Sequence, residues 1–376
     1  MIIIIVWEQR KLGEFGSVAM NKRIFKKQTT KLGDVPFYKI GTFGKKPDAY
    51  ISNELFEEYK SKYPYPETGD LLISASGSIG RIVEYKGQKA YFQDSNIVWL
   101  KHNDQLNNLF LKAFYHIVKW DGTEGSTIKR LYNKNILRTK ISLPTVLEQE
   151  KIGEIIEHIE QLTALQQRKI DLLIQISKVL SKITQPKLTT INGIMLKEFV
   201  NVKIKTINTS KLKKNKYLEY SMPAFDNNEV PQIISSKNIR SSKILIEKPV
   251  ILFNKLNVRK RRVWNLKKIQ TNAIASTEFI PLELKPSIDQ NYLYFLLKSD
   301  YVTAQMIARS TGSSNSQKRI RKEDLLSIRI RNLPSIEKQR KIANILLNYE
   351  KLIHQNKEIK KILLSLKKSL LQQMFI

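Results

Sequence analysis

The feature that most limits what this chain can fold into is a motif that occurs twice. Leu143-Pro144-x-x-x-x-Gln149-x-Lys151-Ile152-x-x-Ile155 returns 190 residues later as Leu333-Pro334-x-x-x-x-Gln339-x-Lys341-Ile342-x-x-Ile345. Upstream, with a slip of one residue, Lys129-Arg130-Leu131 matches Lys318-Arg319-Ile320. Because the identities lie in register on both sides of the Leu-Pro corner, we interpret them as an internal duplication rather than a chance match.

Each Leu-Pro corner is followed by apolar residues at alternating intervals of three and four, the heptad spacing of a coiled-coil helix. Pro144 and Pro334 are placed where a helix can start, and Pro186 ends the first helix. Ordinary core-facing helices are the alternative, but polar residues at matching heptad positions favour two helices that pack on each other. The predicted seam residues are Ile152, Ile155, Ile159, Leu162, Gln166, Lys169, Ile342, Ile345, Asn356 and Ile359.

The two stretches that precede the helices mix short β-rich runs with helical runs, which predicts α+β domains. A length of 376 residues agrees with about two domains. The predicted division is a first globular domain at 1–143, a first helix at 144–185, a second globular domain at 186–333 and a second helix at 334–376. Away from the repeated motifs the two blocks have little in common, which predicts one fold with two different surfaces.

The charge predicts a polyanionic partner. Lys plus Arg number 65 against 34 Asp plus Glu, a net charge of +31, yet 41% of the residues are hydrophobic. Such a chain can bury a core beneath a positive exterior that attracts nucleic acid or an anionic membrane. The apolar opening Met1 to Trp7 meets Glu8 and Arg10 well before a spanning length, so we expect a strand or docking arm in a soluble protein. The absence of cysteine fits a reducing cytoplasm and excludes thiol chemistry.

Candidate DNA contacts lie in a Gly-rich turn and in basic loops. Gly77-Ser78-Ile79-Gly80-Arg81 is either a plain tight turn or one whose amides and Arg81 face a phosphate. No acid occurs between Glu247 and Glu278, where basic residues surround Trp264. For each stretch a solvated loop is the alternative. The candidate residues are Gly77, Ser78, Gly80, Arg81, Ser126, Thr127, Lys129, Arg130, Lys255, Arg259, Lys260, Arg261, Arg262, Ser313, Ser314, Asn315, Lys318 and Arg319.

Motifs for catalysis are missing from the sequence. It has no phosphate loop and no nucleotide-binding Gly-rich motif, and its four histidines lack metal-ligand spacing. We therefore expect neither a catalytic nor a metal site. Two rival hypotheses stay open: a Mg²⁺-dependent nuclease that uses Asp70, Glu84 and Lys86, and a coiled-coil scaffold without a DNA role.

Several segments resemble the specificity subunits of type I restriction-modification systems. They are Trp7-Glu8-Gln9-Arg10-Lys11-Leu12-Gly13, Asp70-Leu71-Leu72-Ile73-Ser74 before Gly77-Ser78-Ile79-Gly80, the Gly-Ser-Thr loop, and the Leu-Pro-x-x-x-x-Gln-x-Lys-Ile motif. The resemblance spans essentially the whole chain. It implies two target-recognition domains separated by two long helices packed as an antiparallel coiled coil, each domain reading one half of a bipartite DNA target. If the helices are centred on each other, Lys169 faces Asn356.

The resemblance also implies partners. Such a subunit has no catalytic site and binds no cofactor itself. It recruits two modification subunits, which use S-adenosylmethionine to methylate adenine, and in the larger complex restriction subunits that use ATP and Mg²⁺. The second block departs from the family pattern, because Asn254-Lys255-Leu256-Asn257 stands where a Gly-x-x-Gly turn is expected, so the role of that loop stays open.

Overall fold

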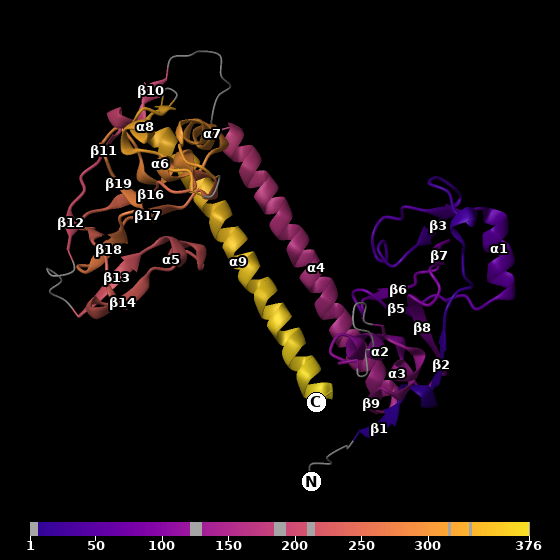
Figure 1. Ribbon diagram of the computed structural model, residues 1–376. Coiled ribbons are helices and arrows are strands. Elements are labelled where there is room, and N and C mark those ends of the chain that lie inside the picture. Colours follow the sequence, from indigo (N-terminus) through magenta and orange to yellow (C-terminus); the bar gives the residue numbers. More distant parts are fainter. Residues whose placement is uncertain are drawn as a thin grey trace, which may run out of the picture. The chain divides into compact units, whose positions relative to one another are not determined.

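The computed structural model describes residues 7–120, 130–183, 193–208, 215–314, 317–330 and 333–375 (Figure 1). Contacts divide the chain into two compact units. The first unit comprises residues 1–168 and 358–376, and the second comprises residues 169–357. Each long helix is cut by this division, so each unit consists of one globular block with part of both helices.

The first unit contains most of the first half of the sequence. Its strands are β1 Glu8–Lys11, β2 Gly16–Ala19, β3 Val35–Tyr38, β4 Tyr50–Ile51, β5 Leu71–Ser74, β6 Ile82–Glu84, β7 Tyr91–Phe92, β8 Ile97–His102 and β9 Lys140–Leu143. Its helices are α1 Asn53–Lys62, α2 Asn108–Tyr115, α3 Asn133–Arg138 and the start of α4 Val146–Ile183. The last part of α9 Ile336–Phe375 also belongs to it.

The second unit repeats this order with additions. Its strands are β10 Ile194–Met195, β11 Val200–Asn201, β12 Thr206–Ile207, β13 Lys216–Tyr220, β14 Gln232–Ser235, β15 Lys243–Leu245, β16 Val250–Asn254, β17 Val263–Leu266, β18 Ala273–Ser276, β19 Phe279–Leu284 and β20 Arg329–Ile330. Its own helices are α5 Met222–Asp226, α6 Gln290–Leu297, α7 Asp300–Arg309 and α8 Lys322–Leu326.

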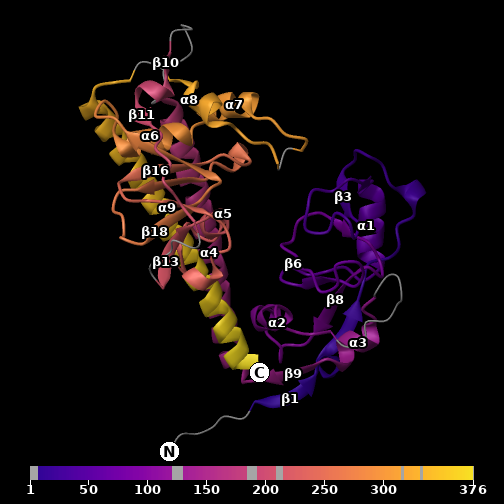
Figure 2. The same ribbon diagram turned by 60° about the vertical axis from the view of Figure 1, so that its left-hand side comes forward.

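Two sheets recur in both units. A two-stranded ladder pairs β1 with β9 (Figure 2) and β10 with β20. A four-stranded antiparallel sheet has the order β2-β8-β5-β6 in the first unit and β11-β19-β16-β17 in the second. The third sheet differs, since it has the order β4-β3-β7 in the first unit and β12-β15-β18-β13-β14 in the second. The prediction of one α+β fold with two different surfaces is confirmed for the shared sheets, and the units diverge in the third.

The central strands are apolar without alternation because both of their faces are buried. In β5, Leu71 and Ile73 pack in one core and Leu72 packs in another with Trp99. In β16, Ile251 and Phe253 occupy one core while Val250 and Leu252 occupy a second. Successive side chains of a strand point to opposite faces, so each strand joins the shared half of its unit to the divergent half.

The repeated glutamine explains why the Leu-Pro motif is retained. Gln149 is 1% exposed, and its Nε2 donates to the carbonyl oxygens of Gln105 at 3.0 Å and Pro144 at 3.1 Å while its Oε1 accepts the Asn107 amide at 2.9 Å. In the second unit, Gln339 makes the same three bonds to Ser287, Pro334 and Asp289 at 3.2, 2.9 and 2.8 Å. The motif therefore ties the first turn of each long helix to the loop that precedes α2 or α6.

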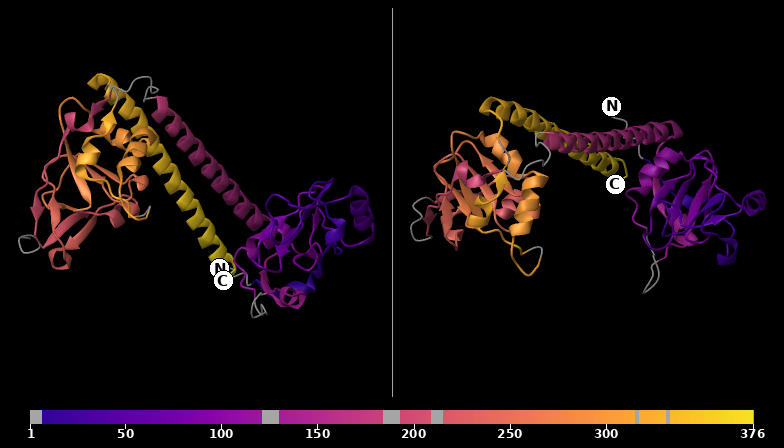
Figure 3. Two further views of the ribbon diagram at one scale, coloured as in Figure 1. Left: turned by 45° about the horizontal axis from the view of Figure 1, so that its top comes forward. Right: turned by 90° about the horizontal axis from the view of Figure 1, so that it is seen from above.

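The two long helices pack antiparallel within the first unit (Figure 3). Ile156 of α4 packs with Leu371 of α9, and Lys367 and Lys360 of α9 donate to Glu160 at 2.5 Å and to Gln167 at 2.6 Å. The residue numbers of the α9 partners decrease as those of α4 increase, which confirms the predicted antiparallel pairing.

The predicted seam is correct in part. Ile159 and Asn356 are buried, and Ile152, Gln166 and Ile342 are half-buried. Five predicted seam residues are exposed instead: Ile155, Leu162, Lys169, Ile345 and Ile359. The neighbouring residues Ile156, Ile170 and Leu346 are buried in their place. The predicted Lys169–Asn356 contact is therefore wrong, and Asn356 Nδ2 donates to the Leu352 carbonyl oxygen at 2.6 Å.

The physical reason for these errors is that each long helix has two apolar stripes with heptad spacing, of which one is buried and the other faces solvent. The sequence does not distinguish the stripes.

Among the described helices, none combines the length and the apolar character that crossing a membrane requires.

Candidate nucleic-acid interface

The Gly-rich turn of the first unit connects β5 to β6. Gly77 and Gly80 have φ of 66° and 81°, a left-handed conformation that glycine adopts without strain. Ser74 closes the turn, because its Oγ donates to the Ser78 carbonyl oxygen and accepts the Arg81 amide at 2.9 Å. Gly77 and Ser78 are exposed as a result, and the turn presents its backbone to solvent.

Arg130, at the end of the Gly-Ser-Thr loop, lies directly against this turn. Arg130 forms a β-bridge with Ser76, and the Leu131 amide donates to the Ala75 carbonyl oxygen at 2.8 Å. Asn96, which precedes β8, accepts from Ser76 Oγ at 2.6 Å and from Arg130 Nη2 at 3.3 Å. Two candidate segments that are far apart in the sequence therefore form one junction.

The second unit builds the same junction from different residues. Leu256 forms a β-bridge with Arg319, and the Asn257 and Ile320 amides donate to the Lys318 and Lys255 carbonyl oxygens at 2.8 and 3.0 Å. Asn257 and Arg261 have φ of 51° and 47°, so they take the left-handed positions held by glycine in the first unit. The loop without Gly-x-x-Gly thus adopts an equivalent turn.

Three predicted DNA-contacting arginines have internal roles instead. Arg262 is 9% exposed and donates to both carboxylate oxygens of Asp226 at 2.7 and 2.6 Å, which lowers the pKa of Asp226. Arg261 donates to the Lys298 carbonyl oxygen at 2.8 Å and to Asp300 at 2.5 Å. Arg81 donates to the Phe43 carbonyl oxygen at 2.9 Å. The buried Arg262 is therefore not placed to contact DNA, whereas Arg81 and Arg261 are half-buried and also hold neighbouring segments together.

The aromatic residue of the predicted basic cluster is buried and is not available to stack on a base. Trp264 is 5% exposed and packs edge-on against Tyr220 and Phe225. Arg259 and Lys260 remain exposed beside it, and Lys260 lies 3.9 Å from Asp226. The cluster is therefore a basic surface over an aromatic core rather than a stacking platform.

Other candidates have mixed outcomes. Ser313 and Ser314 are exposed, and Lys255 and Lys318 are half-buried in the second junction. Ser126, Thr127, Lys129 and Asn315 lie outside the described residues.

Sequence reasoning missed a basic loop in the first unit. Lys26, Lys27 and Lys31 are exposed between β2 and β3, together with Phe25 at 55% and Leu32 at 85% exposure. Basic residues around exposed apolar side chains are typical of surfaces that approach DNA. The density of lysine in residues 22–31 was the available signal.

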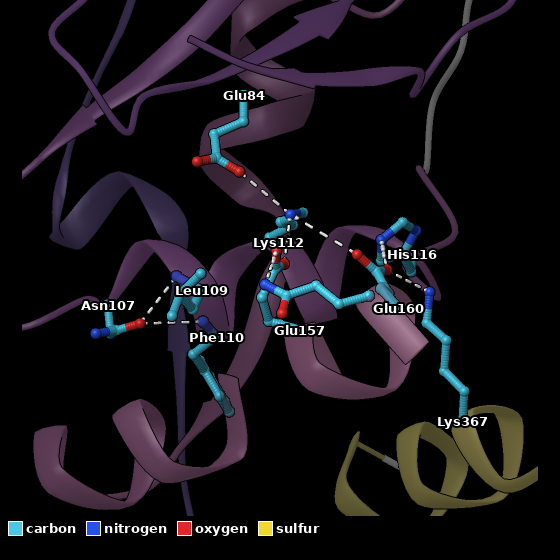
Figure 4. Close-up of polar contacts among 10 residues, drawn as sticks. Glu84, Asn107, Leu109, Phe110, Lys112, His116, Glu157, Glu160 and Lys367 are labelled. Atoms are coloured by element: carbon cyan, nitrogen blue, oxygen red, sulfur yellow. Dashed lines mark hydrogen bonds and ion pairs between the residues drawn. The ribbon is translucent and has the colours of Figure 1, made fainter. Parts of the chain in front are cut away.

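Ion pairs attach the first globular block to the long helices. Lys112 of α2 contacts Glu84 at 3.2 Å and Glu157 of α4 at 2.6 Å, and His116 Nε2 lies 2.8 Å from Glu160 (Figure 4). Burial alone would raise the pKa of Glu160, but hydrogen bonds with His116 and Lys367 lower it to about 2. In the second unit, Lys298 contacts Glu350 of α9 at 2.8 Å, which is the equivalent of the His116–Glu160 pair.

The carboxylates of the rival nuclease hypothesis have structural partners. Asp70 accepts the Glu67 amide at 2.7 Å in a turn, and Glu84 contacts Lys112. Burial raises the pKa of Asp70. Within the described ranges, no group of three or more His, Asp or Glu side chains is gathered where a metal ion could bind.

Two units that share a fold, each with a basic junction of the same backbone pairing, define a class of internally duplicated α+β proteins. The sequence profile of the Type I restriction modification DNA specificity domain matches residues 5–175 and again residues 191–364. The chain belongs to this family.

A similar sequence is the Putative type I restriction enzyme specificity subunit S.HindORF215P of Haemophilus influenzae. The two are 59% identical over 154 residues, which are 41% of this chain. The match spans 40% of that relative's length.

Solved structures share the fold across the whole chain. The S subunit of a type I restriction-modification system from M. genitalium superposes with a TM-score of 0.64 at 16% identity, covering 100% of this chain and 98% of that one. A structure described as the structural basis underlying complex assembly and conformational transition of the type I R-M system gives 0.54 at 15% identity, covering 98% and 97%.

Proposed function

We propose that this chain is the DNA-recognition subunit of a type I restriction-modification complex. Each globular block reads one half of a bipartite target in double-stranded DNA, and the paired helices set the gap between the halves. Family membership supports the DNA role. The proposal adds that each globular block recognises one half-site and that the helices set the gap.

The duplicated junction is the single observation that carries the proposal. Each unit places an exposed arginine, Arg130 or Arg319, against the turn that follows the strand β5 or β16 of the shared sheet. The backbone pairing is the same, while the side chains around it differ. One scaffold with two unlike surfaces suits two unlike half-sites. The spacing between half-sites is set by the geometry of the protein in DNA readers of this kind.

The exposed second stripe of the helices supports the docking of two modification subunits. In the first unit it consists of Ile155, Leu162 and Leu165 on α4 with Ile359, Ile362 and Leu366 on α9. In the second unit it consists of Leu172, Ile176 and Val179 on α4 with Ile345 and Leu352 on α9.

These stripes repeat with the duplication, since Ile155 and Leu162 correspond to Ile345 and Leu352. Heptad-spaced apolar residues that face solvent are suited to receive a partner helix. Two equivalent stripes therefore suit two copies of the same partner.

The remaining chemistry is assigned to partner subunits. In this proposal the chain is non-catalytic and binds no cofactor. The modification subunits bind S-adenosylmethionine and methylate adenine, and the restriction subunits use ATP and Mg²⁺. The complex would act in the cytoplasm without a membrane partner. The roles of these subunits follow from the resemblance of the sequence to specificity subunits.

Salt dependence of DNA binding tests the proposal on the chain itself. Each phosphate neutralised by Lys or Arg adds about 0.9 to the slope of log affinity against log salt concentration. We expect weak binding of the isolated chain to duplex DNA that falls steeply from low to moderate salt, and sequence-selective binding once a modification subunit is added. Binding that is flat with salt, or no gain in selectivity on adding that subunit, would contradict the proposal.

A further inference from the structure

One guanidinium group in each unit is held by an acceptor at an equivalent place. Arg130 Nη2 donates to Asn96 Oδ1 at 3.3 Å, and Arg319 Nη2 lies 3.1 Å from Glu278 Oε1. Asn96 immediately precedes β8 and Glu278 immediately precedes β19, which are equivalent strands of the shared sheet. The duplication has therefore kept the arrangement while changing the acceptor from a neutral amide to a carboxylate.

Both acceptors are fixed to the junction by further bonds. Asn96 Oδ1 accepts from Ser76 Oγ at 2.6 Å, and the Asn96 carbonyl oxygen accepts the Ala75 amide at 2.7 Å. The Glu278 carbonyl oxygen accepts the Lys255 amide at 2.9 Å and Asn254 Nδ2 at 3.4 Å. An acceptor held this firmly limits the orientations of the arginine that it binds.

The carboxylate of Glu278 is held in a way that stability alone does not explain. Its Oε2 is buried and has no hydrogen-bond partner among the described residues. An unsatisfied buried acceptor costs about 1–3 kcal/mol, and the ion pair with Arg319, whose side chain is 54% exposed, offsets only part of that cost. Such an arrangement is typical of a group retained for a role in positioning.

The two arginines differ from their neighbours in keeping donors available. Arg262 is buried and uses two of its nitrogens on Asp226, and Arg261 uses two on Lys298 and Asp300. Arg130 and Arg319 are exposed, and within the described part of the chain each has one side-chain acceptor. Arg130 also borders an open hollow of about 490 Å³, lined in addition by Tyr132 and Lys134.

We propose that Arg130 and Arg319 are base-reading residues, one for each half-site, and that Asn96 and Glu278 are the positioning residues that aim them. The ligand is the O6 and N7 edge of a guanine in the major groove, which matches the fork of an arginine. This inference rests on the proposed function and deepens it, because it assigns these two cations to bases rather than to phosphates.

The assignment to bases depends on the fixed orientation of each guanidinium group. A phosphate contact needs only a positive charge within reach, so a mobile lysine or arginine serves it equally well. A bidentate contact to guanine needs the plane of the guanidinium in one orientation, and an acceptor bound to one nitrogen supplies that orientation before DNA arrives. The charged Glu278 holds its arginine more firmly than the neutral Asn96 does, so we expect stricter discrimination in the half-site read by the second unit.

The test uses the full chain assembled with its modification subunit, and the readout is the set of methylated sequences in a randomised DNA library. Arg130→Lys and Arg319→Lys keep the charge and remove the fork. Each is expected to relax one base position in its own half-site by about tenfold or more while leaving the salt slope of binding unchanged. Arg138→Lys and Arg240→Lys are matched controls, since both arginines are exposed on the same units away from the junctions.

The positioning residues are tested by Asn96→Ala and Glu278→Gln. Each is expected to relax the same base position as the lysine variant of its arginine, with a smaller effect. An unchanged recognition sequence with uniformly weaker binding would overturn the inference and identify phosphate contacts. An unchanged sequence and unchanged affinity would also overturn it and leave a structural ion pair. Failure of the proposed function is distinct, because the wild-type complex would then methylate no defined sequence.

Discussion

The turn after β5 and the turn after β16 solve one conformational problem with different residues. In the first unit, Gly77 and Gly80 occupy the left-handed positions. In the second unit, Asn257 and Arg261 occupy them, and Arg261 is held by bonds to Lys298 and Asp300. The difference teaches that the backbone path of the junction is the constrained property. Side chains on that path can vary, which is what the proposed reading of two different half-sites requires.

The attachment of each block to the helices shows the same division. Gln149 and Gln339 are identical in type and in their three bonds. The ion pairs beside them differ, with His116–Glu160 in the first unit and Lys298–Glu350 in the second. The hydrogen bonds to the backbone are the same in both units. The ion pairs differ in the basic residue, which is a histidine in the first unit and a lysine in the second.

The largest effect on stability is expected from the repeated glutamines. Gln149→Leu or Gln339→Leu leaves a buried amide and two carbonyl oxygens without their partner, which should lower the free energy of unfolding by about 3 kcal/mol in either unit. Urea unfolding of the full chain measures it, with the exposed Gln161→Leu as the control. If one variant costs less than about 1 kcal/mol, the motif does not act alike in the two units.

A smaller, pH-dependent effect is expected from Glu160. Glu160→Gln removes the negative charge that His116 and Lys367 contact and leaves one neutral amide oxygen as acceptor, which should cost about 1–3 kcal/mol at pH 7. The pKa of Glu160 is lowered to about 2 in the folded protein, from an ordinary value of 4.5. The contribution is thus present above about pH 4.5 and is lost as the pH falls toward 2.

The unfolding free energies of the wild type and of Glu160→Gln should therefore converge on acidification. The exposed Glu154→Gln is the control and should show no such convergence. A difference between wild type and Glu160→Gln that stays constant from pH 7 to pH 3 would show that the carboxylate charge is not what stabilises the contact.

The turn positions should differ by about 1 kcal/mol. Gly77→Ala places an L-residue at φ of 66°, and the cost is conformational because the nearest atom to the new Cβ is Ile40 Cγ1 at 4.0 Å. Asn257→Gly is expected to change stability by less than about 0.5 kcal/mol, since glycine suits the same conformation. Thermal unfolding compares the two. Equal losses would indicate that the turns are not equivalent.

The smallest effect on stability is expected from the exposed stripes. Leu162→Gln and Leu352→Gln should each change the free energy of unfolding by less than about 0.5 kcal/mol and yet weaken co-purification of the modification subunit. Gln161→Glu is the control for a change beside the stripe. A loss of stability above about 2 kcal/mol would show that these leucines pack within the chain.

The long helices and the duplication could be predicted because they depend on local spacing and on identities in register. The Leu-Pro corners are followed by helices that begin at Val146 and Ile336. The choice of seam could not be predicted. Ile155 and Ile156 are adjacent and equally apolar, and which of them is buried depends on whether the partner is the other helix or a separate protein.

The candidate site was predictable as segments but not as roles. The basic loops and the Gly-rich turn were found by composition, and the structure joins them in one junction in each unit. Arg261 and Arg262 could not be told from Arg319 in sequence, because their partners Asp300, Asp226 and Glu278 come from elsewhere in the chain. Asn96 and Glu278 carry no motif, and only their place before an equivalent strand reveals them.

The most direct test of modular reading is to exchange residues 190–333 for the equivalent block of a relative that recognises another sequence. The chimera is assembled with its modification subunit, and the methylated adenines in host genomic DNA are mapped by sequencing. The account predicts that one half of the recognised sequence changes while the other half and the gap between them stay the same. A change in both halves, or in the gap, would contradict it.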